Sequence, residues 1–152
     1  MRLQYRALML LAIFAVCAMT ACAILSPSTP TPIPFDRYSA QNVFDAFARA
    51  GLQIQNPEKN LVVTGRGAPG ALEDRYLFEI PRIAPAGGQI IIFASADQLQ
   101  AWQTYIDKLR ASSDTRRDVV YTFVKDNVLL QLNPALTTAE ANAYRDAFMA
   151  LP

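Results

Sequence analysis

The sequence has no histidine, and its two cysteines, Cys17 and Cys22, both lie in an apolar segment near the N-terminus. The absence of histidine excludes Ser-His-Asp and Cys-His catalysis and every metal site that depends on an imidazole. The rest of the chain also lacks the thiols needed for a disulfide, a thiolate nucleophile or a cysteine-ligated metal. We therefore expect no metal, no other cofactor and no catalytic residues, and carboxylates are the general bases that remain.

An excess of charge of one sign is missing as well. The 14 lysines and arginines and the 13 aspartates and glutamates give a formal net charge of +1. Removal of residues 1–21 would remove Arg2 and Arg6 and change the net charge to −1. Because nucleic-acid binding needs a concentrated basic surface, we expect no nucleic acid among the partners.

The N-terminus has the pattern of an export signal. Arg2 and Arg6 precede a segment, residues 7–25, in which every residue except Thr20 is apolar or small. Positive charge stays on the cytoplasmic side of a membrane, and a basic start followed by an apolar run is typical of a signal peptide. The sequence after this segment is therefore expected on the extracytoplasmic face.

Within this segment, Met19-Thr20-Ala21-Cys22 resembles a bacterial lipobox, although Met19 stands where leucine is more usual. The resemblance implies cleavage between Ala21 and Cys22 and lipid attachment, such as palmitate, at Cys22, which would hold the protein at the cell membrane. Two alternatives remain open. About 20 apolar residues are enough to span a bilayer, so the segment could be an uncleaved anchor helix. Cleavage without lipidation would instead release a secreted protein.

A proline-rich stretch follows, with four prolines among the nine residues 26–34. Proline removes backbone donors and favours the extended polyproline II conformation. We interpret residues 22–34 as a lipidated cysteine and tether, between a leader (1–21) and a single folded domain (35–152).

Three helices are predicted in this domain. The first has Ser39 as its N-cap and ends at Gly51, where a left-handed residue is expected. The second follows Ser95, with Gln98 completing a capping box, and has an apolar stripe at Leu99, Trp102, Ile106 and Leu109. The third begins after Thr137, with Glu140 in a second capping box.

Five strands are predicted from short apolar or alternating runs, at residues 61–64, 75–80, 89–94, 119–124 and 128–132. The run at 89–94 is apolar throughout and predicts a central strand. The last two runs predict a hairpin that turns at Asp126-Asn127 and places Phe123 opposite Leu130. The order α-β-β-β-α-β-β-α, with short links, predicts an α+β fold: a mainly antiparallel sheet with three helices packed on it.

The phrases at residues 38–52 and 124–133 resemble those of small bacterial envelope lipoproteins. Together with the leader and the Trp102 helix, this resemblance spans most of the chain. No activity is assigned to that group, so it implies an envelope location and no site residues.

Two arginines are the candidate ligand-binding residues. Arg66 lies in the glycine-rich stretch 65–70, which we interpret as a turn because it lacks the lysine of a phosphate-binding loop. Arg82 begins the long link between two predicted strands. Loops carry function more often than their share of the chain, so both could form an anion site, although surface arginines usually only keep loops solvated.

These patterns favour a membrane-anchored, non-catalytic accessory module that binds another envelope protein. A domain that binds a small ligand or cell-wall glycan is the alternative, and a hydrolase that uses only carboxylates is a weaker one. A concave site with convergent polar groups would favour the second or third function, whereas a large exposed apolar patch would favour the first.

Overall fold

The computed structural model describes residues 35–152. The predicted leader, the lipidation site Cys22 with its neighbour Ala21, and the proline-rich tether lie outside these residues. Among residues 35–152 no helix combines the length and the apolar character needed to cross a membrane.

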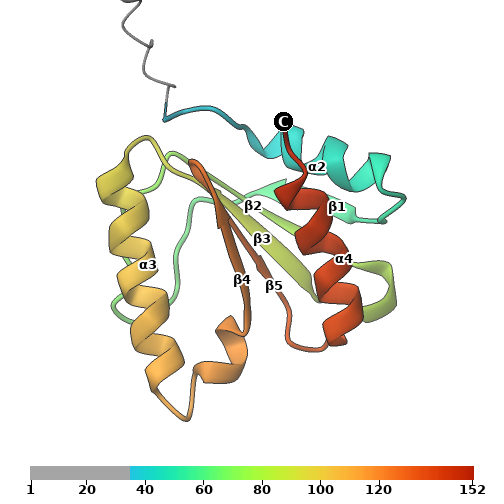
Figure 1. The fold of residues 1–152 in the computed structure, drawn as a ribbon. Coiled ribbons are helices and arrows are strands. Elements are labelled where there is room, and N and C mark those ends of the chain that lie inside the picture. Colours follow the sequence, from blue (N-terminus) through green and yellow to red (C-terminus); the bar gives the residue numbers. More distant parts are fainter. Residues whose placement is uncertain (1–34) are drawn as a thin grey trace, which may run out of the picture. The chain divides into compact units, whose positions relative to one another are not determined.

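The described chain is an α+β domain with a five-stranded antiparallel sheet and three α-helices, as the sequence predicts (Figure 1). The order of the strands in the sheet is β1-β2-β3-β5-β4. The strands are β1 (Gln55–Lys59), β2 (Asp74–Glu79), β3 (Gly87–Ile92), β4 (Tyr121–Lys125) and β5 (Val128–Leu132). The helices are α2 (Ala40–Arg49), α3 (Ala96–Ala111) and α4 (Thr138–Met149), with short 3₁₀ turns η1 (Pro81–Ile83) and η2 (Arg116–Val119).

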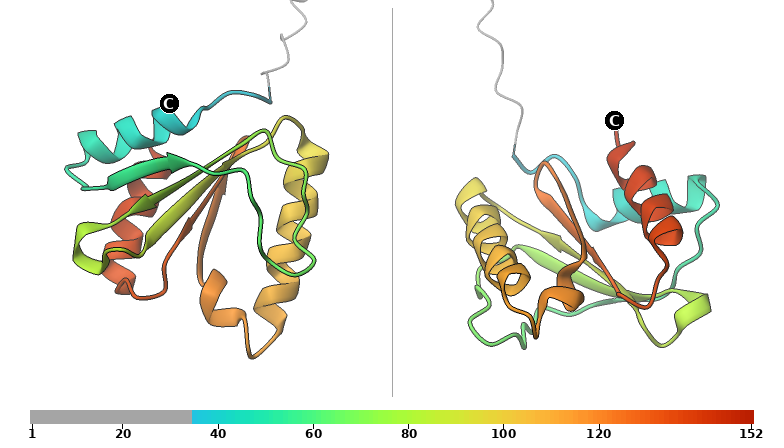
Figure 2. Two further views of the ribbon diagram at one scale, coloured as in Figure 1. Left: turned by 180° about the vertical axis from the view of Figure 1, so that it is seen from behind. Right: turned by 60° about the horizontal axis from the view of Figure 1, so that its bottom comes forward.

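The helices are divided unequally between the two faces of the sheet. Helices α2 and α4 lie side by side on one face, and α3 lies alone on the other (Figures 1 and 2). Strand β3 is central and contributes side chains to the core on both faces of the sheet. Ile90 and Ile92 pack toward α2 and α4, while Ile91 and Phe93, the residue after the strand, pack toward α3. The prediction of a central strand buried on both sides is confirmed.

Local signals at the helix ends are mostly confirmed. Ser39 and Thr137 form reciprocal capping boxes at the starts of α2 and α4. Gly51 has φ +71°, and the Leu52 N–H donates to the Phe47 carbonyl oxygen at 2.9 Å, so α2 ends in a Schellman motif. Of the two hydrogen bonds in the capping box predicted for α3, only the one to the Ser95 side chain forms. Ser95 accepts the Gln98 N–H, but the Gln98 side chain accepts the N–H of Ala94.

The hairpin has the predicted register, with Phe123 opposite Leu130, although β4 begins at Tyr121 and the residues before it form η2. Its turn residue Asn127 is only 1% exposed. The Asn127 side chain accepts the N–H of Tyr38 at 2.9 Å and donates to the Tyr38 carbonyl oxygen at 2.8 Å. Its own carbonyl oxygen accepts the N–H of Phe93, at the end of β3.

The strand predicted at residues 61–64 is wrong. The first strand is β1, whose five residues are all exposed and include Pro57. A polar segment of this kind carries no strand signal, and it joins the sheet only because β2 offers it an edge, where proline is tolerated. After Asn60 the chain leaves the sheet, and Leu61 and Val62 are 52% and 68% exposed.

The capping box of α4 makes domain stability depend on pH. The Glu140 carboxylate accepts hydrogen bonds from the Thr137 hydroxyl at 2.7 Å and from the Thr137 N–H at 2.8 Å, and these bonds hold its pKa below the usual value. A lowered folded pKa stabilises the fold above the unfolded pKa, about 4.3, and this contribution is lost as the pH falls through the folded pKa.

We therefore expect the free energy of unfolding, measured by urea titration, to fall on acidification below about pH 4.5, and to fall less in Glu140→Gln. The difference between the two proteins should be largest at neutral pH. Glu58→Gln, a change at an exposed glutamate on β1 that caps no helix, is the control. Parallel pH profiles for wild type and Glu140→Gln would contradict the assignment.

Candidate functional site

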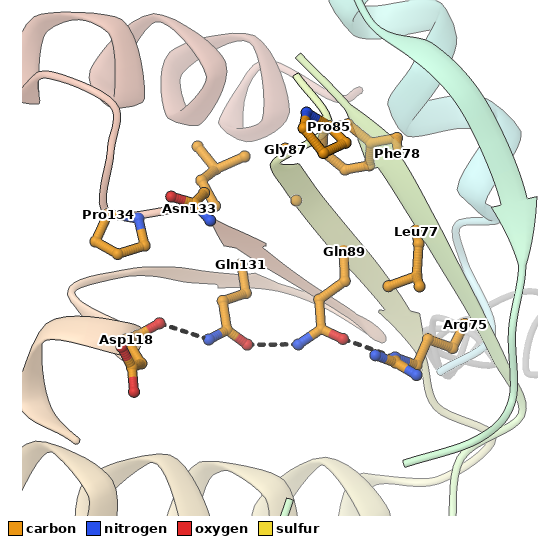
Figure 3. A pocket seen from close by; sticks show the side chains of 12 residues that line it. Arg75, Leu77, Phe78, Pro85, Gly87, Gln89, Asp118, Gln131, Asn133 and Pro134 are labelled. Carbon is orange, nitrogen blue, oxygen red and sulfur yellow. Dashed lines mark hydrogen bonds between the residues drawn. The ribbon is translucent and has the colours of Figure 1, made fainter. Parts of the chain in front are cut away.

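A row of polar side chains crosses the face of the sheet on which α3 lies (Figure 3). The Arg75 Nε donates to the Gln89 side-chain oxygen at 2.6 Å. The Gln89 amide donates to the Gln131 side-chain oxygen at 2.6 Å, and the Gln131 amide donates to the Asp118 carbonyl oxygen at 2.8 Å. We call Arg75, Gln89 and Gln131, which come from β2, β3 and β5, the polar row.

The register of the sheet places these three side chains together. Gln89 pairs directly with Gln131, and it also pairs with Leu77, which lies two residues from Arg75 on the same face. Two residues further along β3, Ile91 belongs to the apolar core under α3. The polar row therefore marks the boundary at which that core ends.

The two ends of the row fix the orientation of both amides. The Arg75 guanidinium can only donate and the Asp118 carbonyl oxygen can only accept, so each glutamine must turn its oxygen toward Arg75 and its nitrogen toward Asp118. Each amide still has a second N–H and a second lone pair. The row is therefore ordered internally and keeps hydrogen-bonding capacity for a further molecule.

A cavity of about 400 Å³ lies between α3, the 63–68 loop and this face of the sheet. We call it the α3 cavity. The polar row lines one side of it, together with Arg66 and Asp118. Its apolar walls are formed by Val63, Ala68, Trp102, Tyr105, Ile106, Leu109 and Val119. The cavity thus combines a mainly apolar interior with a few convergent polar groups, as small-molecule sites do.

A second hollow, of about 480 Å³, begins on the other side of the polar row (Figure 3). We call it the outer groove. Pro85, Gly87, Asn133 and Pro134 line it beyond the row. A side chain at Gly87 would collide with the backbone of β2, so glycine is needed where β2 and β3 approach closely. Because the row lines both hollows, one ligand in contact with it can extend into either.

Arg75 is a half-buried cation held by neutral acceptors. Its Nη1 donates to the carbonyl oxygens of Asn60 and Val62, and its Nε donates to Gln89. No carboxylate within residues 35–152 forms an ion pair with it, since the neighbouring Asp74 pairs with Lys59 at 2.9 Å. Burial lowers the pKa of Arg75 from its ordinary value, and the group nevertheless remains charged at neutral pH.

Trp102, in the core beneath the cavity, has a buried donor without a partner among residues 35–152. The side chain is 3% exposed and packs against Phe93 and Tyr105, so the prediction that it is a core residue is confirmed. Its indole N–H is buried and has no acceptor within residues 35–152. A buried unpaired donor costs about 1–3 kcal/mol, and such groups call for a water molecule or a ligand.

The two arginines singled out from the sequence are not brought together. Arg66 lies in the predicted turn, where Gly67 has φ +75°, and lines the α3 cavity. Arg82 lies on the opposite face of the sheet, where its guanidinium forms an ion pair with Glu140 and donates to the Ala135 carbonyl oxygen at 3.1 Å. Arg82 thus joins the β2–β3 link to the start of α4.

The residues that the sequence analysis missed are those of the polar row. All three lie within the strands predicted at residues 75–80, 89–94 and 128–132. The available signal was a single polar residue within an apolar strand, as in Val128-Leu-Leu-Gln-Leu132.

Comparisons of the chain with protein-family models, curated protein sequences and solved structures find no match. In the part of the chain that the structure describes, no cluster of three or more metal-ligating side chains is present.

The polar row should contribute measurably to stability. Gln131→Leu removes the acceptor of the Gln89 amide and the donor to the Asp118 carbonyl, so we expect the free energy of unfolding to fall by about 1–2 kcal/mol. Gln103→Leu, at an exposed position on α3, is the matched control and should change it by less than about 0.5 kcal/mol. Urea denaturation followed by circular dichroism measures both, and equal effects would show that the row contributes nothing.

Proposed function

We propose that this chain is a non-catalytic binding domain, held on the extracytoplasmic face of a bacterial membrane through Cys22, that takes a small ligand in the α3 cavity. The observation that carries the proposal is the cavity itself, in which the polar row borders mainly apolar walls. Such a combination provides apolar contact area together with a few groups that orient the ligand.

The composition of the cavity favours binding over hydrolysis. Asp118 is the one acidic residue that lines it. Hydrolysis of a glycoside by carboxylates uses a pair of them that flank the scissile bond. The cavity offers amides and guanidinium groups instead, which hold a ligand but do not exchange protons with it at neutral pH.

A protein partner remains the second candidate function, supported by Leu61 and Val62. These two adjacent apolar side chains are among the most exposed of the domain, and they lie in the segment that leads into the wall of the cavity. A patch of two residues is small for a docking surface, which is why the cavity carries the first proposal.

The membrane location rests on the sequence of the leader. A basic start, an apolar run and the lipobox-like Met19-Thr20-Ala21-Cys22 support lipidation at Cys22. We expect metabolic labelling with an alkyne-bearing fatty acid to mark the wild-type protein and to leave Cys22→Ser unmarked. Cys17→Ser, in the same apolar segment, is the matched control and should be labelled like the wild type. Equal labelling of all three proteins would overturn lipidation at Cys22.

Ligand binding is tested with 2-naphthamide, a flat neutral probe that carries one amide. Ligand-detected NMR on the full chain in lipid nanodiscs, corrected with empty nanodiscs, should show saturable binding. Ala68→Trp fills the cavity wall and should weaken binding about tenfold or more. Ala48→Trp, at an exposed position on α2 on the other face of the sheet, should bind like the wild type. Equal binding by the two variants, or no saturable binding of either this probe or its carboxylate analogue 2-naphthoate to the wild type, would reject the cavity as the site.

A further inference from the structure

We propose that the ligand of the α3 cavity is an amphipathic organic anion, with a single carboxylate held at Arg75 and an apolar body against Tyr105 and Leu109. This inference rests on the proposed binding function and adds the chemical class of the ligand. It follows from five features of the cavity: the donors of Arg75, the charge balance, the donors of the polar row, the apolar wall and the position of the outer groove.

Arg75 has donors to spare on one side of its guanidinium. Of its five N–H groups, the one on Nε is donated to Gln89, and Nη1 donates to the carbonyl oxygens of Asn60 and Val62. The two N–H groups on Nη2 have no acceptor among residues 35–152. Three fixed bonds hold the planar group in place, so it need not be ordered when a carboxylate binds.

The charges around the cavity fit one negative charge on the ligand. Arg75 and Arg66 are the two cations that line it, and Asp118 is the one acid. The formal balance at the cavity is thus one uncompensated positive charge. Because Arg75 is half-buried and surrounded by neutral partners, its charge is less screened by solvent than that of an exposed arginine. A hydrogen bond between a guanidinium and a carboxylate is stronger than one between neutral groups.

The polar row favours a carboxylate over a neutral amide. The unused N–H of Gln89 and that of Gln131 extend the set of donors beyond Arg75, in a line across three strands. A carboxylate has about four lone-pair sites and can accept from several of these donors at once. A neutral amide of the same shape can accept at only one of its two polar atoms.

The rest of the ligand must be apolar, at least in part. Tyr105 and Leu109 on α3 are partly exposed and line the cavity, and Tyr105 is held edge to face against the buried Trp102 with their ring centroids 5.8 Å apart. Burial of a flat hydrocarbon body against such side chains removes apolar surface from water and favours binding. The outer groove on the far side of the row leaves room for a polar extension of the acid end.

The test compares 2-naphthoate with 2-naphthamide, which share their shape and differ in charge. Both are titrated into the full chain in lipid nanodiscs by ligand-detected NMR, with empty nanodiscs as the blank. We expect the naphthoate to bind at least about tenfold more tightly, the factor that corresponds to about 1.4 kcal/mol. Arg75→Gln should abolish this preference, and Arg49→Gln, at an exposed position on α2, should retain it.

A second variant guards against a rearranged cavity, because Arg75 also holds the 60–62 segment. Gln89→Glu keeps an acceptor for the Arg75 Nε and places a negative charge beside the guanidinium. It should weaken naphthoate about tenfold or more and leave naphthamide unchanged.

The outcomes separate the two proposals. If wild type binds naphthamide as tightly as naphthoate, or if Gln89→Glu retains the preference, the anionic class is overturned and the binding function stands. If neither probe binds the wild type, the proposed function fails, and this inference fails with it.

Discussion

Two helices cover one face of the five-stranded sheet and a single helix covers the other, and the arrangement of the site follows from this unequal cover. Two helices on one face seal it with a core that runs from Val43 on α2 to Phe148 on α4. A single helix about 10–12 Å wide cannot seal the other face. The strands β3 and β5 accordingly change from apolar to polar residues along that face, from Ile91 to Gln89 and from Leu129 to Gln131. The polar row and both hollows lie where the cover by α3 ends.

The same unequal cover explains why the Arg75 guanidinium can be half-buried without an ion pair to a carboxylate among residues 35–152. Replacing Arg75 by an apolar residue would extend the core, but there is no helix above to complete it. The guanidinium instead ties the edge of the sheet to the departing chain at Asn60 and Val62. Desolvation of such a charge is unfavourable unless its hydrogen bonds are satisfied. The three hydrogen bonds to neutral oxygens offset that cost and leave the positive charge uncompensated. Arg75 therefore both stabilises the 60–62 segment and gives the cavity its positive charge.

The sequence predicts those parts of the fold that depend on neighbours along the chain. Ser39, Gly51 and Thr137 act within one helical turn, and the β4–β5 register follows from a two-residue turn, so each can be derived from a short segment. Strand β1 could not be derived, because Gln55-Asn-Pro-Glu-Lys59 forms a strand only on the edge that β2 offers. The candidate site could not be derived for a related reason. Gln89 and Gln131 are 42 residues apart, and only the pairing of β3 with β5 makes them neighbours. Of the two arginines chosen from loop position alone, Arg66 lines the cavity, whereas Arg82 joins the β2–β3 link to the start of α4.

Asn127 links the start of the described chain directly to the sheet. Its side chain binds both backbone groups of Tyr38, and its own carbonyl oxygen binds the end of β3. A pull transmitted along the residues that precede Tyr38 therefore reaches the middle of the sheet before it reaches the first turn of α2. With the proposed attachment through Cys22, the domain would be loaded in this direction by a force on its ligand. The Asn127 side chain would then transfer the force to the sheet, so that α2 keeps its packing on the sheet.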